Sequence, residues 1–386
     1  MLAIEHITLV MKDHLIPEAV ILLDNDQIVG FGKQNSFMLP EQAKIIDGGG
    51  HYVGPGLIDI HTHAGGAYMF TENPAKASEF LLKHGVTSVL PALYFNLNKE
   101  GYLSAINLIT KTMKAGLCPN VMGLYMEGPY LNPKYGADRN YNPWGGIVKH
   151  EDYVELIEYV TSVACIWALA PELDGILGFV KDVKKHLPNI VFSVAHSEAT
   201  PQDIERLIPY GLKLGTHHTN ATGNLQKYPE CRGVSVDEAV NYNDAIYAEL
   251  ICDSHGIHVD PYMLRLVSKI KGRDKVILIS DALVFDGPIP LGYEGVTDIN
   301  FDYDGEIAGS KLTLDIACRN MMVHTGCSIV DVFNYASANP ARLLGWHDKG
   351  EISCGNKADL VLVDQWMNVK EVVIDGNLVD LSTAGK

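Results

Sequence analysis

The stretch VGPGLIDIHTHAGG, residues 53–66, decides how the rest of the chain is interpreted. Its apolar run has the length of a buried strand and ends in two histidines separated by one residue, His61 and His63. Side chains two apart on a strand lie on the same face. Both imidazoles can therefore reach one metal ion, and the stretch predicts a strand that ends in a chelating pair. A half-buried polar strand end without a ligand is the alternative.

From Val53 onward, apolar segments of strand length alternate with amphipathic segments of helix length. This alternation is typical of a parallel sheet with helical crossovers. Eight strands are expected, around residues 55–60, 86–91, 121–126, 164–169, 190–195, 212–216, 246–251 and 276–280. Eight is the strand number of a (β/α)8 barrel, which needs about 250 residues. The sequence therefore predicts an α/β protein built on a TIM-like barrel.

The two ends of the chain lack the alternation of strands and helices expected for the barrel. Both consist of short strand-like segments joined by turns. EAVILLDNDQIVGFG near the N-terminus and ADLVLVD near the C-terminus are examples. We expect residues 1–52 and 345–386 to form one small β-sandwich domain. The barrel, residues 53–344, would then be inserted between its two parts.

Polar side chains follow five of the expected strands at their carboxyl ends. They are His61, His63, Glu127, His196, His217 and Asp281. In a barrel these strand ends converge on the axis, where active sites of this fold are built. Taken singly, Glu127 and Asp281 could cap the next segment, and His196 and His217 could be core histidines. Together they favour a metallo-hydrolase site, and imidazoles with carboxylates but no cysteine suit zinc, with iron or manganese as alternatives.

The composition restricts partners and location. Hydrophobic residues make up 47% and charged residues 20%, and the longest apolar runs are strand-sized, so no membrane span is expected. A formal net charge of −17 opposes contact with nucleic acid or anionic lipid, which need clustered lysine and arginine. The opening MLAIEHITLVMKDH has no basic leader with an uninterrupted apolar core, so we expect a cytoplasmic protein. The seven cysteines form no C-x-x-C pair and fit free thiols.

An ordered series of motifs carries a family resemblance over almost the whole chain. The motifs are PGLIDIHTH, MEGPYLNP, AHSEAT, GTHHTNAT, HGIHVDP, LISDA, IAGSKLT and SANPARLLG, followed by KGEISCGNKADLVLVD. Any one of them is modestly specific, whereas the ordered set is highly so. The sequence resembles members of the amidohydrolase superfamily, and within it is similar to the N-acetylglucosamine-6-phosphate deacetylases.

The resemblance implies a site for one or two divalent metal ions per chain. Glu127, His196 and His217 would hold one ion. Relatives that keep the H-x-H pair, as this chain does, can hold a second ion with His61 and His63, bridged by Glu127. The ligand set inferred from the strand ends and the set implied by the family are the same.

The resemblance also implies roles in catalysis and substrate binding. Asp281 would take a proton from the attacking water and pass it to the amine, which leaves poorly unless it is protonated. From the residues alone both assignments stay open, because Asn220 could equally be a turn residue and His258 a polar group at a helix start. The implied substrate contacts are Ala137, Asp138, Asn220, Ala221, His258, Ile307, Ala308 and Gly309. A homodimer is implied as well.

Three departures from the family pattern concern the substrate contacts. Asp138 stands where a substrate-contacting histidine is expected, in the shortened segment NPKYGADRN. Tyr228 stands where relatives place an arginine that helps to hold the sugar phosphate, and Lys227 and Arg232 are the nearby substitutes. Thr219 replaces an expected aromatic residue. Because a guanidinium binds a dianion in a bidentate manner, we expect phosphate to contribute less to recognition here than in typical relatives.

The sequence thus predicts a metal-dependent hydrolase of the acetamide of an N-acetyl amino sugar, with N-acetylglucosamine 6-phosphate as the leading substrate. A deacylase of a different or unphosphorylated N-acyl amino sugar is the alternative. Cyclic-amide hydrolases of the superfamily commonly use a carboxylated lysine after the fourth strand, and the segment WALAPEL has none. A catalytically silent scaffold is disfavoured because no ligand and no general base is missing.

Overall fold

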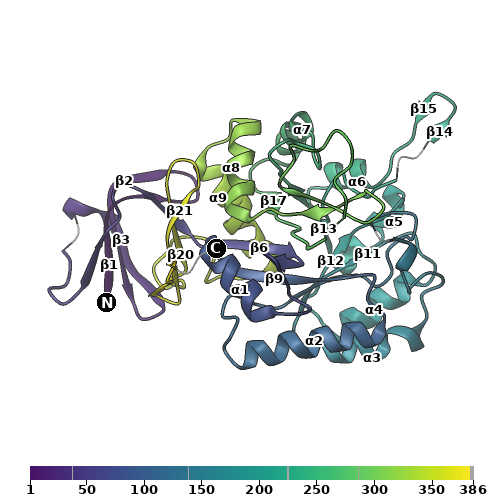
Figure 1. The fold of residues 1–386 in the computed structure, drawn as a ribbon, viewed down its shortest axis with the longest axis horizontal. Helices are drawn as coiled ribbons and strands as arrows, with labels where there is room; N and C mark the ends of the chain where they lie inside the picture. The colour runs from purple at the N-terminus through teal and green to yellow at the C-terminus, as the bar shows by residue number, and fades with distance from the viewer. Residues whose placement is uncertain (37, 138, 224–225, 286, 383–386) are drawn as a thin grey trace.

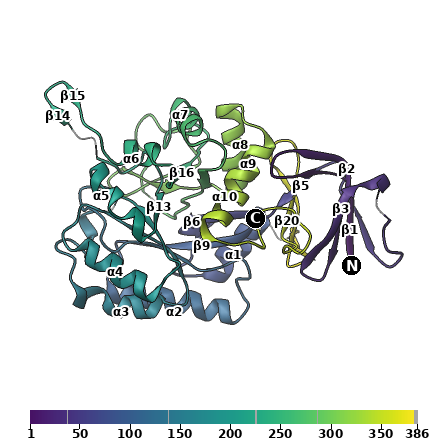
Figure 2. The same cartoon turned by 180° about the vertical axis from the view of Figure 1, so that it is seen from behind.

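The structure is a computed structural model, which describes residues 1–36, 38–137, 139–223, 226–285 and 287–382. Figures 1 and 2 show a barrel covered by helices, with a smaller all-β unit at one end. The first strands of the chain and the last ones lie side by side in that unit. No helix of the described residues is long and apolar enough to cross a membrane.

Eight parallel strands form the barrel. In sheet order they are β6 (Leu57–Thr62), β9 (Val86–Tyr94), β10 (Leu124–Glu127), β11 (Ala164–Leu169), β12 (Val191–Val194), β13 (Leu212–Gly215), β16 (Tyr247–Ile251) and β17 (Val276–Ile279). The sheet returns to its start beyond β17, where the Asp281 amide donates to the His61 carbonyl and the His63 amide to the Ala282 carbonyl, both at 2.9 Å. The predicted barrel and each of its strands are confirmed.

Helices cover the outside of the barrel. They are α1 (Pro74–Lys83), α2 (Lys99–Lys114), α3 (His150–Val160), α4 (Ile176–His186), α5 (Pro201–Glu205), α6 (Val236–Tyr242), α7 (Pro261–Lys271), α8 (Leu314–Thr325), α9 (Ile329–Phe333) and α10 (Asn339–Leu344). A π-helical turn joins the last two. Local sequence sets several starts, since the side chains of Asn73, Asn98, Thr200 and Asp260 each accept a bond from a first-turn amide.

The barrel core is apolar along the strands and becomes polar at their carboxyl ends. Trp167, Tyr125 and Phe192 are among its largest fully buried side chains. Asp59 is an exception inside β6: it accepts a 2.6 Å bond from the Ser280 hydroxyl, and burial raises the pKa of its carboxyl to about 6. A carboxyl that protonates readily can be buried at less cost than an ordinary one.

Strands from both chain ends form the second sheet. They are β1 (Leu2–Val10), β2 (Leu15–Asp24), β3 (Gln27–Lys33), β4 (Lys44–Asp47), β5 (Tyr52–Pro55), β20 (Leu360–Val363), β21 (Val369–Ile374) and β22 (Asn377–Leu378). Their order is β22-β21-β20-β5-β1-β2-β3, with β4 parallel to β1. The ladder curls on itself, since the Ile28 amide donates to the Asn356 carbonyl at 2.9 Å. The two layers of the expected sandwich are therefore parts of one continuous sheet around a separate apolar core.

The chain passes from the small sheet to the barrel at Gly56, between β5 and β6. A side chain here would place a Cβ 2.0 Å from the Thr87 hydroxyl, so the close approach requires glycine. Three short hairpins leave the strand ends of the barrel. They pair β7 (Ala64–Gly65) with β8 (Tyr68–Met69), β14 (Gln226–Tyr228) with β15 (Cys231–Arg232), and β18 (Ile299–Phe301) with β19 (Ile307–Ser310).

Candidate metal centre and active site

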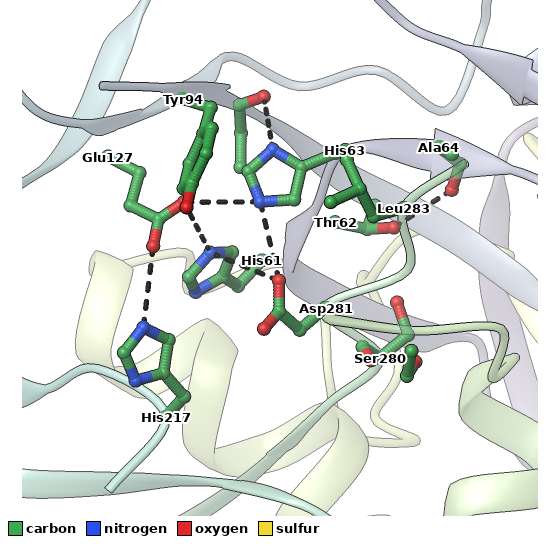
Figure 3. Close-up of polar contacts among 12 residues, drawn as sticks. His61, Thr62, His63, Ala64, Tyr94, Glu127, His217, Ser280, Asp281 and Leu283 are labelled. Atoms are coloured by element: carbon green, nitrogen blue, oxygen red, sulfur yellow. Dashed lines mark hydrogen bonds and ion pairs between the residues drawn. The ribbon is translucent and has the colours of Figure 1, made fainter. Parts of the chain in front are cut away.

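The six polar residues expected at the strand ends meet at the carboxyl end of the barrel, and Figure 3 shows five of them pointing toward one another. Two groups of three ligand atoms lie within 4.8 Å of one another. One group comes from His61, His63 and Glu127, and the other from Glu127, His196 and His217. Both groups are buried, and Glu127 belongs to both.

The two carboxylate oxygens of Glu127 face different pairs of histidines. Oε1 lies 3.0 Å from His196 Nε2 and 3.4 Å from His217 Nε2. Oε2 lies 3.1 Å from His63 Nε2 and 3.5 Å from His61 Nε2. The Nε2 atoms of His196 and His217 are only 3.0 Å apart, although two ring nitrogens repel each other unless a proton or a cation lies between them. The convergence of nitrogen and oxygen donors fits a divalent metal ion at each group.

Three of these residues have a left-handed backbone, which non-glycine residues seldom adopt. The φ angles are 41° at His196, 27° at His217 and 48° at Asp281. Hydrogen bonds fix the last of them, because the Asp281 amide donates to the His61 carbonyl at 2.9 Å and its carbonyl accepts from the Ser310 amide at 2.8 Å. Such conformations cluster at active sites, where surrounding contacts hold them.

Burial and charge act in opposite directions on this centre. Burial by itself would lower the pKa of His63, but hydrogen bonds to Asp281 and Glu127 raise it to about 9. Burial also acts to lower the pKa of His61, but the charges of Glu127 and Glu249 outweigh it and hold this pKa well above its usual range. The histidines in turn hold the pKa of Glu127 well below its usual value. This density of carboxylates favours positive charge, as protons on imidazoles or as a metal ion.

The second ring nitrogens of the H-x-H pair have partners of their own. His61 Nδ1 lies 3.1 Å from Glu249 Oε2, and His63 Nδ1 lies 3.1 Å from the Ala92 carbonyl. Metal-binding histidines usually have such a partner, which fixes the ring and its tautomer. Glu249 is not among the residues predicted from the sequence, where its one signal is an acid inside the apolar segment YAELIC.

A cavity of about 240 Å³ opens at the candidate ligand groups, and most of the implied substrate contacts line it. Its lining includes Ala137, Asn220, Ala221, His258, Ile307, Ala308 and Gly309. Asp138 lies outside the described residues. Asp253 supports the loop that carries His258, since its buried carboxylate accepts bonds from the amides of His255, Ile257 and His258 at 2.8–3.0 Å.

The structure does not bring Lys227, Tyr228 and Arg232 to the cavity of their own chain. They lie in the β14–β15 hairpin, which projects away from the barrel (Figure 1). The Tyr228 residue is 65% exposed. The Arg232 side chain is 74% exposed and forms a 2.5 Å ion pair with Glu238.

A different arginine lies at the cavity. Arg139 is the one lysine or arginine among the described residues that line it. Its guanidinium bonds both carboxylate oxygens of Glu306, at 2.7 and 2.5 Å, and donates to the Gly136 carbonyl at 2.9 Å. A Cβ at Gly136 would lie 2.4 Å from the Nδ1 atom of His196, so this loop packs directly against a candidate ligand. Arg139 is not among the site residues predicted from the sequence, although it lies in the segment NPKYGADRN.

Fold and site together define a barrel hydrolase of the metal-dependent type. The sequence profile of the amidohydrolase family matches residues 52–379, and the chain belongs to that family. It is 29% identical over 345 residues to an N-acetylglucosamine-6-phosphate deacetylase of Bacillus subtilis (strain 168), covering 85% of this chain and 84% of that protein. It is 27% identical over 340 residues to an N-acetylgalactosamine-6-phosphate deacetylase of Escherichia coli O157:H7, covering 84% and 86%.

Solved structures agree with this assignment. The N-acetylglucosamine-6-phosphate deacetylase of Pasteurella multocida superimposes with a TM-score of 0.85 at 25% identity, over 98% of this chain and 99% of that one. The enzyme of the same name from Thermotoga maritima gives a TM-score of 0.82 at 25% identity, with the same coverage. The likeness therefore includes the small β unit as well as the barrel.

Proposed function

We propose that the protein is a metal-dependent deacetylase that hydrolyses the acetamide of N-acetylglucosamine 6-phosphate, giving glucosamine 6-phosphate and acetate. The observation that carries the proposal is the pair of buried ligand groups that share Glu127, set at the base of a cavity lined by the implied substrate contacts. Relatives with this activity in their names, matched over 84–87% of their own length, support the choice of substrate. An N-acetylgalactosamine 6-phosphate substrate is the second candidate, because one relative bears that name.

The proposed metal ligands are those of the two groups. Glu127, His196 and His217 would hold one divalent ion, and His61 and His63 would hold a second through the same Glu127. A divalent ion bound in such a site lowers the pKa of water and polarises a carbonyl oxygen. The left-handed turns after β12 and β13 aim His196 and His217 at this point.

Asp281 is the proposed general base and acid. Its Oδ1 lies 3.3 Å from His63 Nε2, so its carboxylate faces the centre of the ligand groups, and its backbone is fixed on both sides. It would accept a proton from the water that attacks the acetamide carbonyl and donate it to the nitrogen as the C–N bond breaks. His258 and the Asn220–Ala221 turn line the cavity and would orient the sugar.

We also propose a zinc enzyme, a homodimer and a cytoplasmic location. A donor set of imidazoles and carboxylates without cysteine suits zinc, with iron or manganese as alternatives. The projecting β14–β15 hairpin, with its exposed Tyr228 side chain, gives a second copy a surface to cover. Light scattering of the purified protein tests the dimer, and elemental analysis tests the metal.

The test of function is acetate release from a matched panel. It contains N-acetylglucosamine and N-acetylgalactosamine, each free and as the 6-phosphate. We expect the highest kcat/KM for N-acetylglucosamine 6-phosphate and no turnover by Glu127→Gln, which removes the charge shared by both ligand groups. A wild-type protein that contains metal but releases no acetate from any of the four sugars would exclude the proposed activity.

A further inference from the structure

Glu249 is a buried acid whose presence the fold does not explain. It lies in the middle of β16, and the residue is 0% exposed. The other residues of this strand, Tyr247, Ala248, Leu250 and Ile251, are also buried and are apolar or aromatic. Burying an ionised carboxylate is costly unless its oxygens are paired. In the described part of the chain Glu249 forms no ion pair with lysine or arginine, and its Oε1 has no hydrogen-bond partner.

The other oxygen of Glu249 contacts both candidate ligand groups. Oε2 lies 3.1 Å from His61 Nδ1 and accepts a 3.1 Å bond from the backbone amide of His217. The first contact is to a member of the H-x-H group. The second fixes the left-handed backbone of His217, a member of the other group.

The contact with His61 decides which ring nitrogen is free. When Nδ1 donates its hydrogen to Glu249, the lone pair of Nε2 is directed at Glu127, whose Oε2 is 3.5 Å away. Figure 3 shows the His61 ring among Glu127, His63 and Asp281. The Tyr125 ring stacks on His61 with centroids 4.3 Å apart and limits its rotation. The Nδ1 partner of His63 is a neutral carbonyl, so a carboxylate supports His61 alone of the pair.

We propose that Glu249 is a positioning residue for the metal centre. It holds His61 with Nδ1 protonated and Nε2 free to bind the second ion, and its charge makes the imidazole a stronger donor. Through the His217 amide, the same oxygen ties this arrangement to the first ligand group. The inference rests on the proposed two-ion centre and is independent of which sugar is the substrate.

Metal titration of the full-length protein tests the inference. Wild type and variants are stripped of metal and titrated with Zn²⁺ against a competing chelator, and bound ions are counted by elemental analysis. Glu249→Gln keeps an acceptor for Nδ1 but loses the charge, and Glu249→Leu loses both. Because loss of an outer partner typically weakens metal affinity by about 10–100-fold, we expect roughly a tenfold loss for the second ion in Glu249→Gln and about a hundredfold loss in Glu249→Leu.

Asp59→Asn is the matched control. Asp59 is also 0% exposed and lies on β6 beside His61. Its carboxylate accepts bonds from the Ser280 hydroxyl and from the backbone amides of Ser280 and His61, but from no imidazole. Removing this carboxylate should leave both ions bound with affinities within about threefold of wild type, below the range expected for a lost outer partner.

Melting temperatures separate positioning from a structural role. A structural role predicts that Glu249→Leu lowers the melting temperature of the metal-free protein and keeps the gain on adding Zn²⁺. The positioning role predicts a smaller gain in melting temperature on adding Zn²⁺ than in wild type, whatever the melting temperature of the metal-free variant, because that gain depends on the affinity for the ion.

The outcomes distinguish this inference from the proposed activity. Variants that bind both ions within twofold of wild type would overturn the role of Glu249, and so would a wild-type protein that holds a single ion. If the variants lose the second ion but wild type releases no acetate from any N-acetyl hexosamine, the proposed function fails while the inference stands.

Discussion

Replacing Asp281 by asparagine should abolish most turnover and leave the fold intact. The backbone at this position has φ 48°, a conformation that asparagine adopts more readily than most residues. The bonds to the His61 carbonyl and from the Ser310 amide involve the main chain and are retained. Asp281 belongs to neither ligand group, so metal content should change little.

The expected loss of turnover follows from the proton transfer proposed for Asp281. The amide of asparagine cannot accept the water proton or deliver it to the leaving amine. General acid–base catalysis contributes about 10²–10⁴ in rate, so kcat should fall by that factor, or about 2.7–5.4 kcal/mol of transition-state stabilisation. KM should change less, because in the proposed mechanism Asp281 acts on the reacting atoms and other residues orient the sugar.

The assay is acetate release at saturating N-acetylglucosamine 6-phosphate, with metal content and melting temperature measured on the same samples. Asp182→Asn makes the same chemical change on α4, where the carboxylate accepts a bond from the Tyr153 hydroxyl outside the barrel, and should leave kcat unchanged. An Asp281→Asn protein that keeps near-normal kcat with full metal content would refute the role of Asp281 as proton carrier.

Elemental analysis should find more than one ion per wild-type chain and about one in the His61→Asn, His63→Asn double variant, so an unchanged count would exclude the second ion. Removing metal with a chelator should lower the melting temperature. The free energy of unfolding should fall by about 2.7 kcal/mol if the ion had been present at a hundred times its Kd. The preference in kcat/KM for the 6-phosphate over the free sugar should stay below about a thousandfold, because Arg139 at the cavity is already paired with Glu306. A larger preference that Arg232→Ala abolishes would contradict this and show that Arg232 reaches the substrate.

The barrel and the grouping of ligands could be predicted because both depend on simple periodic rules. Apolar segments alternating with amphipathic ones predict parallel strands, and eight of them close a barrel. Once the strands are known, their carboxyl ends must lie around one axis. Residues as far apart as His61 and Asp281 were therefore expected together before any contact was known, and the structure brings them to 3.8 Å between side-chain atoms.

Contacts that cross between loops could not be predicted in the same way. Arg139 and Glu306 are 167 positions apart, and each lies in an irregular segment whose path no sequence period fixes. The β14–β15 hairpin is the same kind of case. The family resemblance implied Tyr228 as a substrate contact, with Lys227 and Arg232 as substitutes, but a position in a family pattern does not determine the direction in which a hairpin leaves the barrel.

Four buried carboxylates in or just after the barrel strands show why stability and function are linked in this centre. Asp59, Glu127, Glu249 and Asp281 are each at most 8% exposed, and among the described residues none of them forms an ion pair with lysine or arginine. The cost of burying Asp59 is reduced because burial raises the pKa of its carboxyl to about 6, so the neutral form is easier to reach than for an ordinary aspartate. The other three contact imidazoles, which are weak counter-ions in a buried site unless they are protonated or bind a cation. The negative charge that makes this end of the barrel costly to bury is therefore the same charge that attracts a divalent ion, and loss of metal should affect stability as well as turnover.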